Sequence, residues 1–79
     1  GLDKVKVKQL KEITSPMPGR ILNIQVQVGD HVKVGEPILS LEAMKMENIL
    51  KSDGEGVVKS VVIVKDQVVD KGELLIEFE

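Results

Sequence analysis

The chain contains an internal repeat, and this repeat constrains the fold more than any other feature of the sequence. A shift of 37 residues superimposes residues 14–42 on residues 51–79. The shift aligns identical serine, glycine and glutamate residues: Ser15 with Ser52, Gly19 with Gly56, Gly35 with Gly72, Glu36 with Glu73 and Glu42 with Glu79. It also aligns aliphatic residues: Ile21 with Val58, Ile24 with Val61, Val26 with Ile63, Val32 with Val69, Ile38 with Leu75 and Leu39 with Ile76. Matching glycines indicate a duplication rather than a chance likeness of valine-rich segments, because glycine marks unusual backbone geometry or close approach.

The two repeats are expected to pack on each other about a pseudo-twofold axis, because one repeat alone is too short to bury its apolar face. In the middle of the repeat Asp30 aligns better with Asp66 than with Gln67, so we expect a one-residue slip absorbed by a β-bulge. The axis relates residue 42 to residue 79 and residue 51 to residue 14. The junction, residues 43–50, is therefore expected at the opposite end of the domain from the chain ends.

Composition and turn spacing favour an all-β fold. The 79 residues form one small domain without cysteine, so its stability rests on aliphatic packing. Apart from Phe78 the apolar residues are nearly all aliphatic, and β-branched valine and isoleucine prefer strands. Turn signals, for example at residues 16–19, 29–30 and 53–56, leave only short strands between them. We predict a flattened antiparallel β-barrel or sandwich of two pseudo-twofold-related repeats.

Residues 1–12 precede the first repeat. Val5 and Val7 alternate with lysines at positions 4, 6 and 8, a pattern compatible with a short edge strand and with a charged linker. We expect a linker or partly ordered N-terminal segment over residues 1–12 and the folded domain over residues 13–79. A start at Gly1 rather than methionine indicates an excised piece of a larger protein, although a residue left by cloning would look the same.

Charge and hydropathy argue against two classes of partner. The net charge of −2 and the single aromatic residue offer neither a basic surface nor stacking platforms for nucleic acid. The longest apolar run, Val61–Val64, is far shorter than the roughly 20 residues that cross a bilayer, so we expect no direct membrane insertion. No secretory signal pattern opens the chain, which predicts a cytoplasmic location, or the mitochondrial matrix in a eukaryote.

Neither a metal site nor a catalytic constellation is expected. His31 is the only histidine, and one imidazole without cysteine or paired acidic ligands makes neither a metal centre nor a triad. We therefore interpret it as a surface turn residue. The glycines at 29, 35, 54, 56 and 72 lack the Lys-Ser/Thr ending of a phosphate loop and are interpreted as turn residues.

The junction between the repeats combines two conflicting signals. Residues 41–50 are rich in alanine, methionine, lysine, glutamate and leucine, which favour a helix. A helix between two small strand repeats would interrupt the barrel, whereas a tight hairpin with Met44 and Lys45 near its apex continues it. Such a turn prefers Asn-Gly or Asp-Gly, so Met-Lys there costs roughly 1–3 kcal/mol. Local preference in conflict with the global pattern indicates a functional site.

The motifs of the chain resemble those of the biotinyl domains of biotin-dependent carboxylases and decarboxylases. The resemblance covers about residues 13–79 and is carried by Ser15-Pro-Met-Pro-Gly19, Gly29-Asp30, Val32-Lys33, Gly35 and Glu42-Ala-Met-Lys-Met-Glu47. It implies that a biotin protein ligase uses ATP to join biotin to Lys45, within the specific core Ala43-Met44-Lys45-Met46. Met44 and Met46 would then help the ligase recognise Lys45, with Glu42 and Glu47 adding negative charge and shape.

The same resemblance implies a carrier role without catalysis. Biotin on Lys45 would accept a carboxyl group at a biotin carboxylase, or from a donor substrate, and deliver it at a carboxyltransferase. Lysine suits this role because acylation of its amine leaves a long flexible arm. The isolated domain is expected to be a monomer.

Two flanking features allow other readings. Met44 and Met46 can fill gaps in a core, but beside a turn lysine they are expected to form an exposed apolar surface. Glu42 and Glu47, expected opposite each other, resemble an acid–base pair, yet no pocket-forming length or further catalytic group accompanies them.

Between Gly19 and Gly29 there is no room for the protruding thumb found in some bacterial acetyl-CoA carboxylase carriers. The chain therefore resembles the thumbless carriers of propionyl-, methylcrotonyl- and pyruvate-carboxylating enzymes, of transcarboxylase and of membrane decarboxylases. The nearest alternative is a lipoyl domain of a 2-oxoacid dehydrogenase or glycine cleavage system. Its lysine typically follows aspartate and precedes alanine, whereas Lys45 stands between two methionines. An unmodified interaction barrel is a third possibility, against which the intact motif argues.

Overall fold

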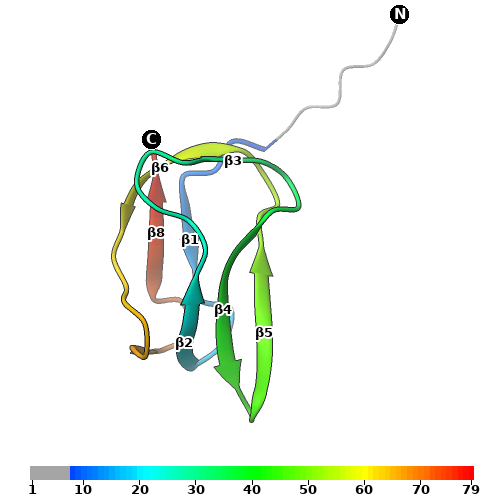
Figure 1. Ribbon diagram of the computed structural model, residues 1–79, viewed down its shortest axis with the longest axis vertical. Coiled ribbons are helices and arrows are strands. Elements are labelled where there is room, and N and C mark those ends of the chain that lie inside the picture. The colour runs from blue at the N-terminus through cyan, green and yellow to red at the C-terminus, as the bar shows by residue number, and fades with distance from the viewer. Residues whose placement is uncertain (1–7) are drawn as a thin grey trace, which may run out of the picture.

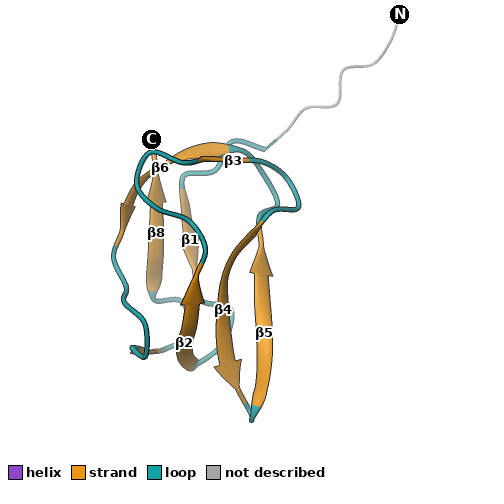
Figure 2. Cartoon of the chain, viewed as in Figure 1, coloured by secondary structure: helices purple, strands orange, loops and turns teal. Residues whose placement is uncertain are grey.

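The structure is a computed structural model that describes residues 8–79, and every regular element in this range is a β-strand (Figures 1 and 2). The strands are β1 (Glu12–Thr14), β2 (Gly19–Ile24), β3 (His31–Val32), β4 (Pro37–Ala43), β5 (Met46–Lys51), β6 (Gly56–Val61), β7 (Val68–Val69) and β8 (Leu74–Phe78). The prediction of an all-β fold is confirmed. Within residues 8–79 no helix has the length and apolarity to cross a membrane.

The strands form two antiparallel sheets of four strands each. Their orders are β1-β8-β6-β3 and β5-β4-β2-β7. Because β3 of the first repeat pairs with β6 of the second, and β7 of the second repeat pairs with β2 of the first, each sheet mixes strands of both repeats. Neither repeat can therefore complete a sheet by itself.

The strand pairings repeat with the spacing expected from the sequence. Gly19 pairs with Val69 in β2 and β7, and Gly56 pairs with Val32 in β6 and β3. The pairing of β2 with β4 shifts register after Ile21, and the pairing of β6 with β8 shifts after the equivalent Val58. The predicted pseudo-twofold arrangement is confirmed.

The expected one-residue slip in the middle of the repeat is wrong. Asp66 occupies the backbone position of Gly29, because both have a left-handed conformation, with φ of 72° and 95°. Gln67 takes the place of Asp30. The Gln67 side-chain oxygen accepts a hydrogen bond from the Val64 amide across 3.1 Å, and the Asp30 carboxylate accepts one from the Gln27 amide across 3.0 Å. Aspartate tolerates the left-handed region better than most residues, so it replaces a glycine here without a bulge.

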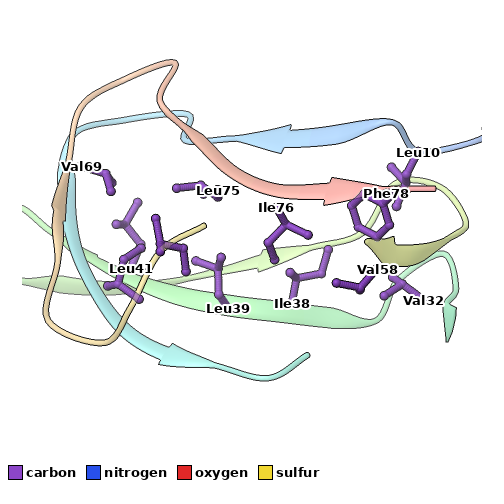
Figure 3. Packing of buried hydrophobic residues seen from close by; sticks show 12 residues of the cluster. Leu10, Val32, Ile38, Leu39, Leu41, Val58, Val69, Leu75, Ile76 and Phe78 are labelled. Atoms are coloured by element: carbon purple, nitrogen blue, oxygen red, sulfur yellow. The ribbon is translucent and has the colours of Figure 1, made fainter. Parts of the chain in front are cut away.

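The core lies between the two sheets and consists of equivalent apolar residues from the two repeats (Figure 3). The aligned pairs that are buried together are Ile21 with Val58, Val32 with Val69, Ile38 with Leu75 and Leu39 with Ile76. Phe78 and Leu41 form a further pair, and Ile24, Val26 and Val61 pack half-buried against the cluster. Full burial of an aliphatic side chain stabilises the fold by roughly 1.5–3 kcal/mol, so these pairs hold the two sheets together.

The segment before β1, residues 8–11, is hydrogen-bonded to the second repeat. The Leu10 amide donates to the Glu55 carbonyl and the Glu55 amide donates to the Lys8 carbonyl, both across 2.8 Å, and the Leu10 side chain is buried. A Cβ atom on Gly54 would lie 2.4 Å from the Lys8 carbonyl oxygen, so this close approach requires glycine. Residues 1–7, with Val5 and Val7, lie outside the described residues, and the division into a linker or partly ordered segment over residues 1–12 and a domain over residues 13–79 stays a prediction.

An ion pair between Lys8 and Asp53 fastens the same segment. The Lys8 ammonium donates to the Asp53 carboxylate across 3.0 Å and holds the pKa of that carboxyl below its ordinary value of 3.8. A depressed pKa in the folded state means that the pair stabilises the fold at neutral pH and ceases to do so as the pH falls through that pKa. The contact is exposed, so its contribution is small.

We therefore expect Lys8→Met to raise the pKa of Asp53 towards 3.8. The measurement is an NMR titration of the Asp53 carboxyl carbon in both proteins. Identical Asp53 titration curves would show that Lys8 does not hold the carboxylate in solution.

The two ends of the described chain lie together, away from the β4–β5 turn. The Phe78 amide donates to the Lys11 carbonyl across 2.9 Å, which places the start of β1 beside the C-terminus. Figure 1 shows the β4–β5 turn at the opposite end of the molecule from the C-terminus. The expected separation of junction and chain ends is confirmed.

Candidate functional site

The junction forms a tight hairpin, not a helix. Only Met44 and Lys45 separate β4 from β5, and Ala43 pairs with Met46 directly below the turn. Both turn residues are left-handed, with φ of 54° for Met44 and 65° for Lys45. Strand pairing therefore overrides the helical propensity of the segment, as tertiary context commonly does.

Lys45 lies at the apex of this hairpin and is exposed. The ion pairs found within residues 8–79 join Lys8 to Asp53 and Arg20 to Glu42 and Asp66, so none of them holds the Lys45 amine. A lysine amine that is accessible and unpaired in this way is open to acylation by another protein. Its rigid turn fixes where the side chain begins, while its methylene stem stays free to move.

The two methionines beside Lys45 face solvent. Met44 is 94% exposed and Met46 is 67% exposed, whereas Ala43 is buried at the end of β4. Neither methionine therefore fills the core, and the interpretation of an exposed apolar surface at the apex is confirmed. Such a surface suits contact with a partner protein or with an apolar stem attached to the lysine.

Glu42 and Glu47 face each other across the two strands, as expected. Like charges directly opposite repel, and Arg20 on the neighbouring β2 offsets this repulsion. Arg20 contacts Glu42 across 2.8 Å and Asp66 across 3.7 Å, all three side chains being partly exposed. β2 can approach β4 this closely because Gly19 has no side chain. A Cβ atom at this position would lie only 2.5 Å from the Glu42 carbonyl oxygen.

Glu42 and Glu47 lie apart from two hollows of the described part of the chain. These hollows, of about 400 and 260 Å³, are lined by neither carboxylate. The ion pair with Arg20 was not foreseen from the sequence. Arg20 and Glu42 are opposite each other on β2 and β4, and the pairing of these strands includes a register shift that the sequence does not reveal.

His31 is exposed, as expected, but it lies in the short strand β3 opposite Val57 rather than in a turn. Within residues 8–79 no group of three or more histidine, cysteine or acidic side chains is placed to hold a metal ion. Gly29, Gly35 and Gly72 have positive φ angles in turns, which confirms their interpretation as turn residues. For Gly56 this interpretation is wrong, because Gly56 begins strand β6 and pairs with Val32.

The left-handed backbone at Met44 gives a direct test of the turn geometry. Asparagine adopts this conformation more readily than methionine, so we expect Met44→Asn to raise the free energy of unfolding by about 0.5–1 kcal/mol. Urea denaturation of both proteins measures the difference. Met46→Asn is the matched control, because Met46 is in strand β5 outside the turn and should show no gain. A loss of stability in Met44→Asn would contradict the left-handed turn.

A duplicated barrel that presents an exposed lysine at the apex of a two-residue hairpin, at the opposite end of the molecule from the C-terminus, has the arrangement of a carrier domain for a covalently attached group. Comparison with known proteins identifies the family within this class. The family model described as "Biotin-requiring enzyme" matches residues 11–78, and the chain belongs to this family. It is a biotinyl carrier domain, and covalent biotin is its cofactor.

Two relatives illustrate the match. The chain is 40% identical over 68 residues to mitochondrial pyruvate carboxylase of Mus musculus, a match that covers 86% of this chain and 6% of that protein. It is 44% identical over 62 residues to the biotin carboxyl carrier protein of Streptococcus mutans, covering 78% of this chain and 48% of that protein. The chain thus spans only a small part of the first relative and about half of the second.

A solved structure confirms the fold. The chain superimposes on the lipoyl domain of the 2-oxoglutarate dehydrogenase complex from Azotobacter vinelandii with a TM-score of 0.76, covering 89% of this chain and 96% of that domain. At 24% identity this likeness concerns the fold alone. The chain therefore has the same architecture as this lipoyl domain.

Proposed function

We propose that this chain is the carboxyl carrier of a biotin-dependent carboxylase and that Lys45 is the residue joined to biotin. The observation that carries the proposal is the position of Lys45 at the apex of the β4–β5 hairpin, exposed and flanked by two exposed methionines. Family membership supplies the cofactor, and an accessible lysine amine fits the carboxyl end of biotin, which forms an amide with it.

Attachment requires a biotin protein ligase as a partner. The ligase uses ATP to activate the carboxyl group of biotin. The neutral Lys45 amine attacks the activated carbonyl carbon, the bond from this carbon to the phosphate leaving group breaks, and the amine releases a proton. In this step Met44 and Met46 offer the ligase an apolar surface on both sides of the amine, and Glu42 and Glu47 add negative charge below the turn.

Bound biotin supplies a ureido nitrogen that takes up and releases the carboxyl group, and the residues of this chain carry that nitrogen between active sites. The hairpin presents the arm at the opposite end of the molecule from the C-terminus. Tethering replaces diffusion by a high effective concentration at each site, provided that the linker spans the distance between sites. The partners are a biotin carboxylase and a carboxyltransferase.

The parent protein is proposed from the relatives. Those matched include pyruvate carboxylase, the α chain of propionyl-CoA carboxylase and free-standing carrier protein. We propose a parent that carboxylates an oxoacid or acyl-CoA, in the cytoplasm or the mitochondrial matrix, and a monomeric state for the isolated domain.

The decisive experiment is co-expression with a biotin protein ligase followed by peptide mass mapping. One biotin per chain is expected, on Lys45. Lys51→Arg serves as the control, because Lys51 lies on the same hairpin at the far end of β5 and its loss should leave labelling intact. Modification mainly at another lysine, or the mass of a lipoyl group on Lys45, would overturn the assignment.

A further inference from the structure

Asn48 makes contacts that the carrier function described so far does not use. It lies on β5 opposite Leu41, three residues after the turn lysine, and its side chain is half-buried. Its amide nitrogen Nδ2 donates to the Met46 carbonyl across 3.2 Å and approaches the Leu41 carbonyl at 3.5 Å. Asparagine is disfavoured in strands, and its cross-strand partner Leu41 is fully buried, so a β-branched apolar residue would suit this position better for stability alone.

The stronger of these bonds acts on the backbone that closes the turn. Met46 is the first residue after Lys45 and pairs with Ala43, so its carbonyl belongs to the pair directly below the apex. A side-chain donor on this carbonyl restricts rotation of the peptide between Met46 and Glu47. Because Met46 follows Lys45 immediately, this restriction also limits the directions in which the Lys45 side chain leaves the turn.

We propose that Asn48 is a positioning residue for the acylation of Lys45: by binding the Met46 carbonyl it keeps the apex of the hairpin in one orientation. The inference rests on the proposed function of Lys45. Asn48 touches neither the reacting amine nor the biotin carboxyl group, and it acts through the backbone of Met46.

The test uses the 79-residue chain and its ligase with three variants. Asn48→Asp keeps the shape of the side chain but removes both donors, and Asn48→Leu removes them without adding charge. Asn23→Asp is the matched control, because Asn23 is the only other asparagine, lies exposed on β2 of the same sheet, and makes none of the side-chain hydrogen bonds found within residues 8–79.

We expect both Asn48 variants to lower the kcat of biotinylation by about fivefold to tenfold, the equivalent of roughly one hydrogen bond, with KM for the chain within about twofold. Asn23→Asp should change neither parameter by more than about twofold. A second readout needs no ligase: the backbone order parameter of the Lys45 amide, measured by NMR relaxation, should fall from about 0.85 towards 0.6 in the Asn48 variants.

The two readouts separate the possible failures. If the Asn48 variants leave both the kcat of biotinylation and the order parameter of Lys45 unchanged, the inference is overturned. This holds even if the variants unfold at a lower urea concentration, because Asn48 would then have a purely structural role. If the unaltered chain is not labelled on Lys45, the proposed function fails, while the order parameter still decides whether Asn48 holds the apex.

Discussion

Replacing Lys45 by arginine is expected to abolish biotinylation of the chain and all carrier activity that depends on it. Arginine keeps the positive charge, but its guanidinium stays protonated and does not form the amide. Lys45 is exposed outside the core, so the free energy of unfolding should stay within about 0.5 kcal/mol of the unaltered value. Streptavidin blotting and urea denaturation measure the two effects separately.

A core substitution provides the opposite control for that experiment. Leu75 is fully buried between the sheets, so Leu75→Ala should lower the free energy of unfolding by roughly 2–5 kcal/mol. At urea concentrations below its unfolding midpoint, the Leu75→Ala variant should still accept biotin on Lys45. If Lys45→Arg proved the more destabilising of the two, the hairpin would be a structural element rather than a site of attachment.

Moving the lysine by one position is the second prediction with a large effect. Exchanging the two turn residues, in a Met44→Lys and Lys45→Met double variant, should lower the rate of biotinylation by about tenfold to a hundredfold, because a small misplacement of a reacting group has effects of this size. The amine stays on an exposed apex, but adjacent side chains of a hairpin point in different directions.

The opposite shift, Lys45→Met with Met46→Lys, tests the same idea on the β5 side of the turn. Both double variants keep the composition of the chain, and circular dichroism confirms that they fold. Labelling at the normal rate in both would mean that the ligase reads a flexible peptide, and the rigid hairpin would then be irrelevant to recognition.

The repeat and the hairpin were predictable from the sequence because both follow from the match between residues 14–42 and residues 51–79. Gly19 and Gly56 mark equivalent close approaches of two strands, so their match along the chain revealed the symmetry of the fold. The hairpin followed from that symmetry, although the residues at the junction favour a helix. In both cases the global pattern outweighed local propensity.

Other features were not predictable because they depend on backbone conformation and register. Asp30 and Asp66 are identical residues at non-equivalent positions, and only their φ angles show that Asp66 corresponds to a glycine. The contact of Arg20 with Glu42 depends on how the neighbouring strands β2 and β4 align. No short sequence pattern encodes such alignments when a register shift intervenes.

The mixing of both repeats in each sheet sets an order of events during synthesis of the chain. Lys45 leaves the ribosome before β6, β7 and β8 exist, and until then the core cluster that includes Leu39 and Leu41 lacks its residues from the second repeat. An apolar face left open in this way does not hold a stable hairpin. The hairpin apex that presents Lys45 is therefore expected to form only once β8 has emerged, so a ligase that reads this shape would act after the whole domain has been synthesised.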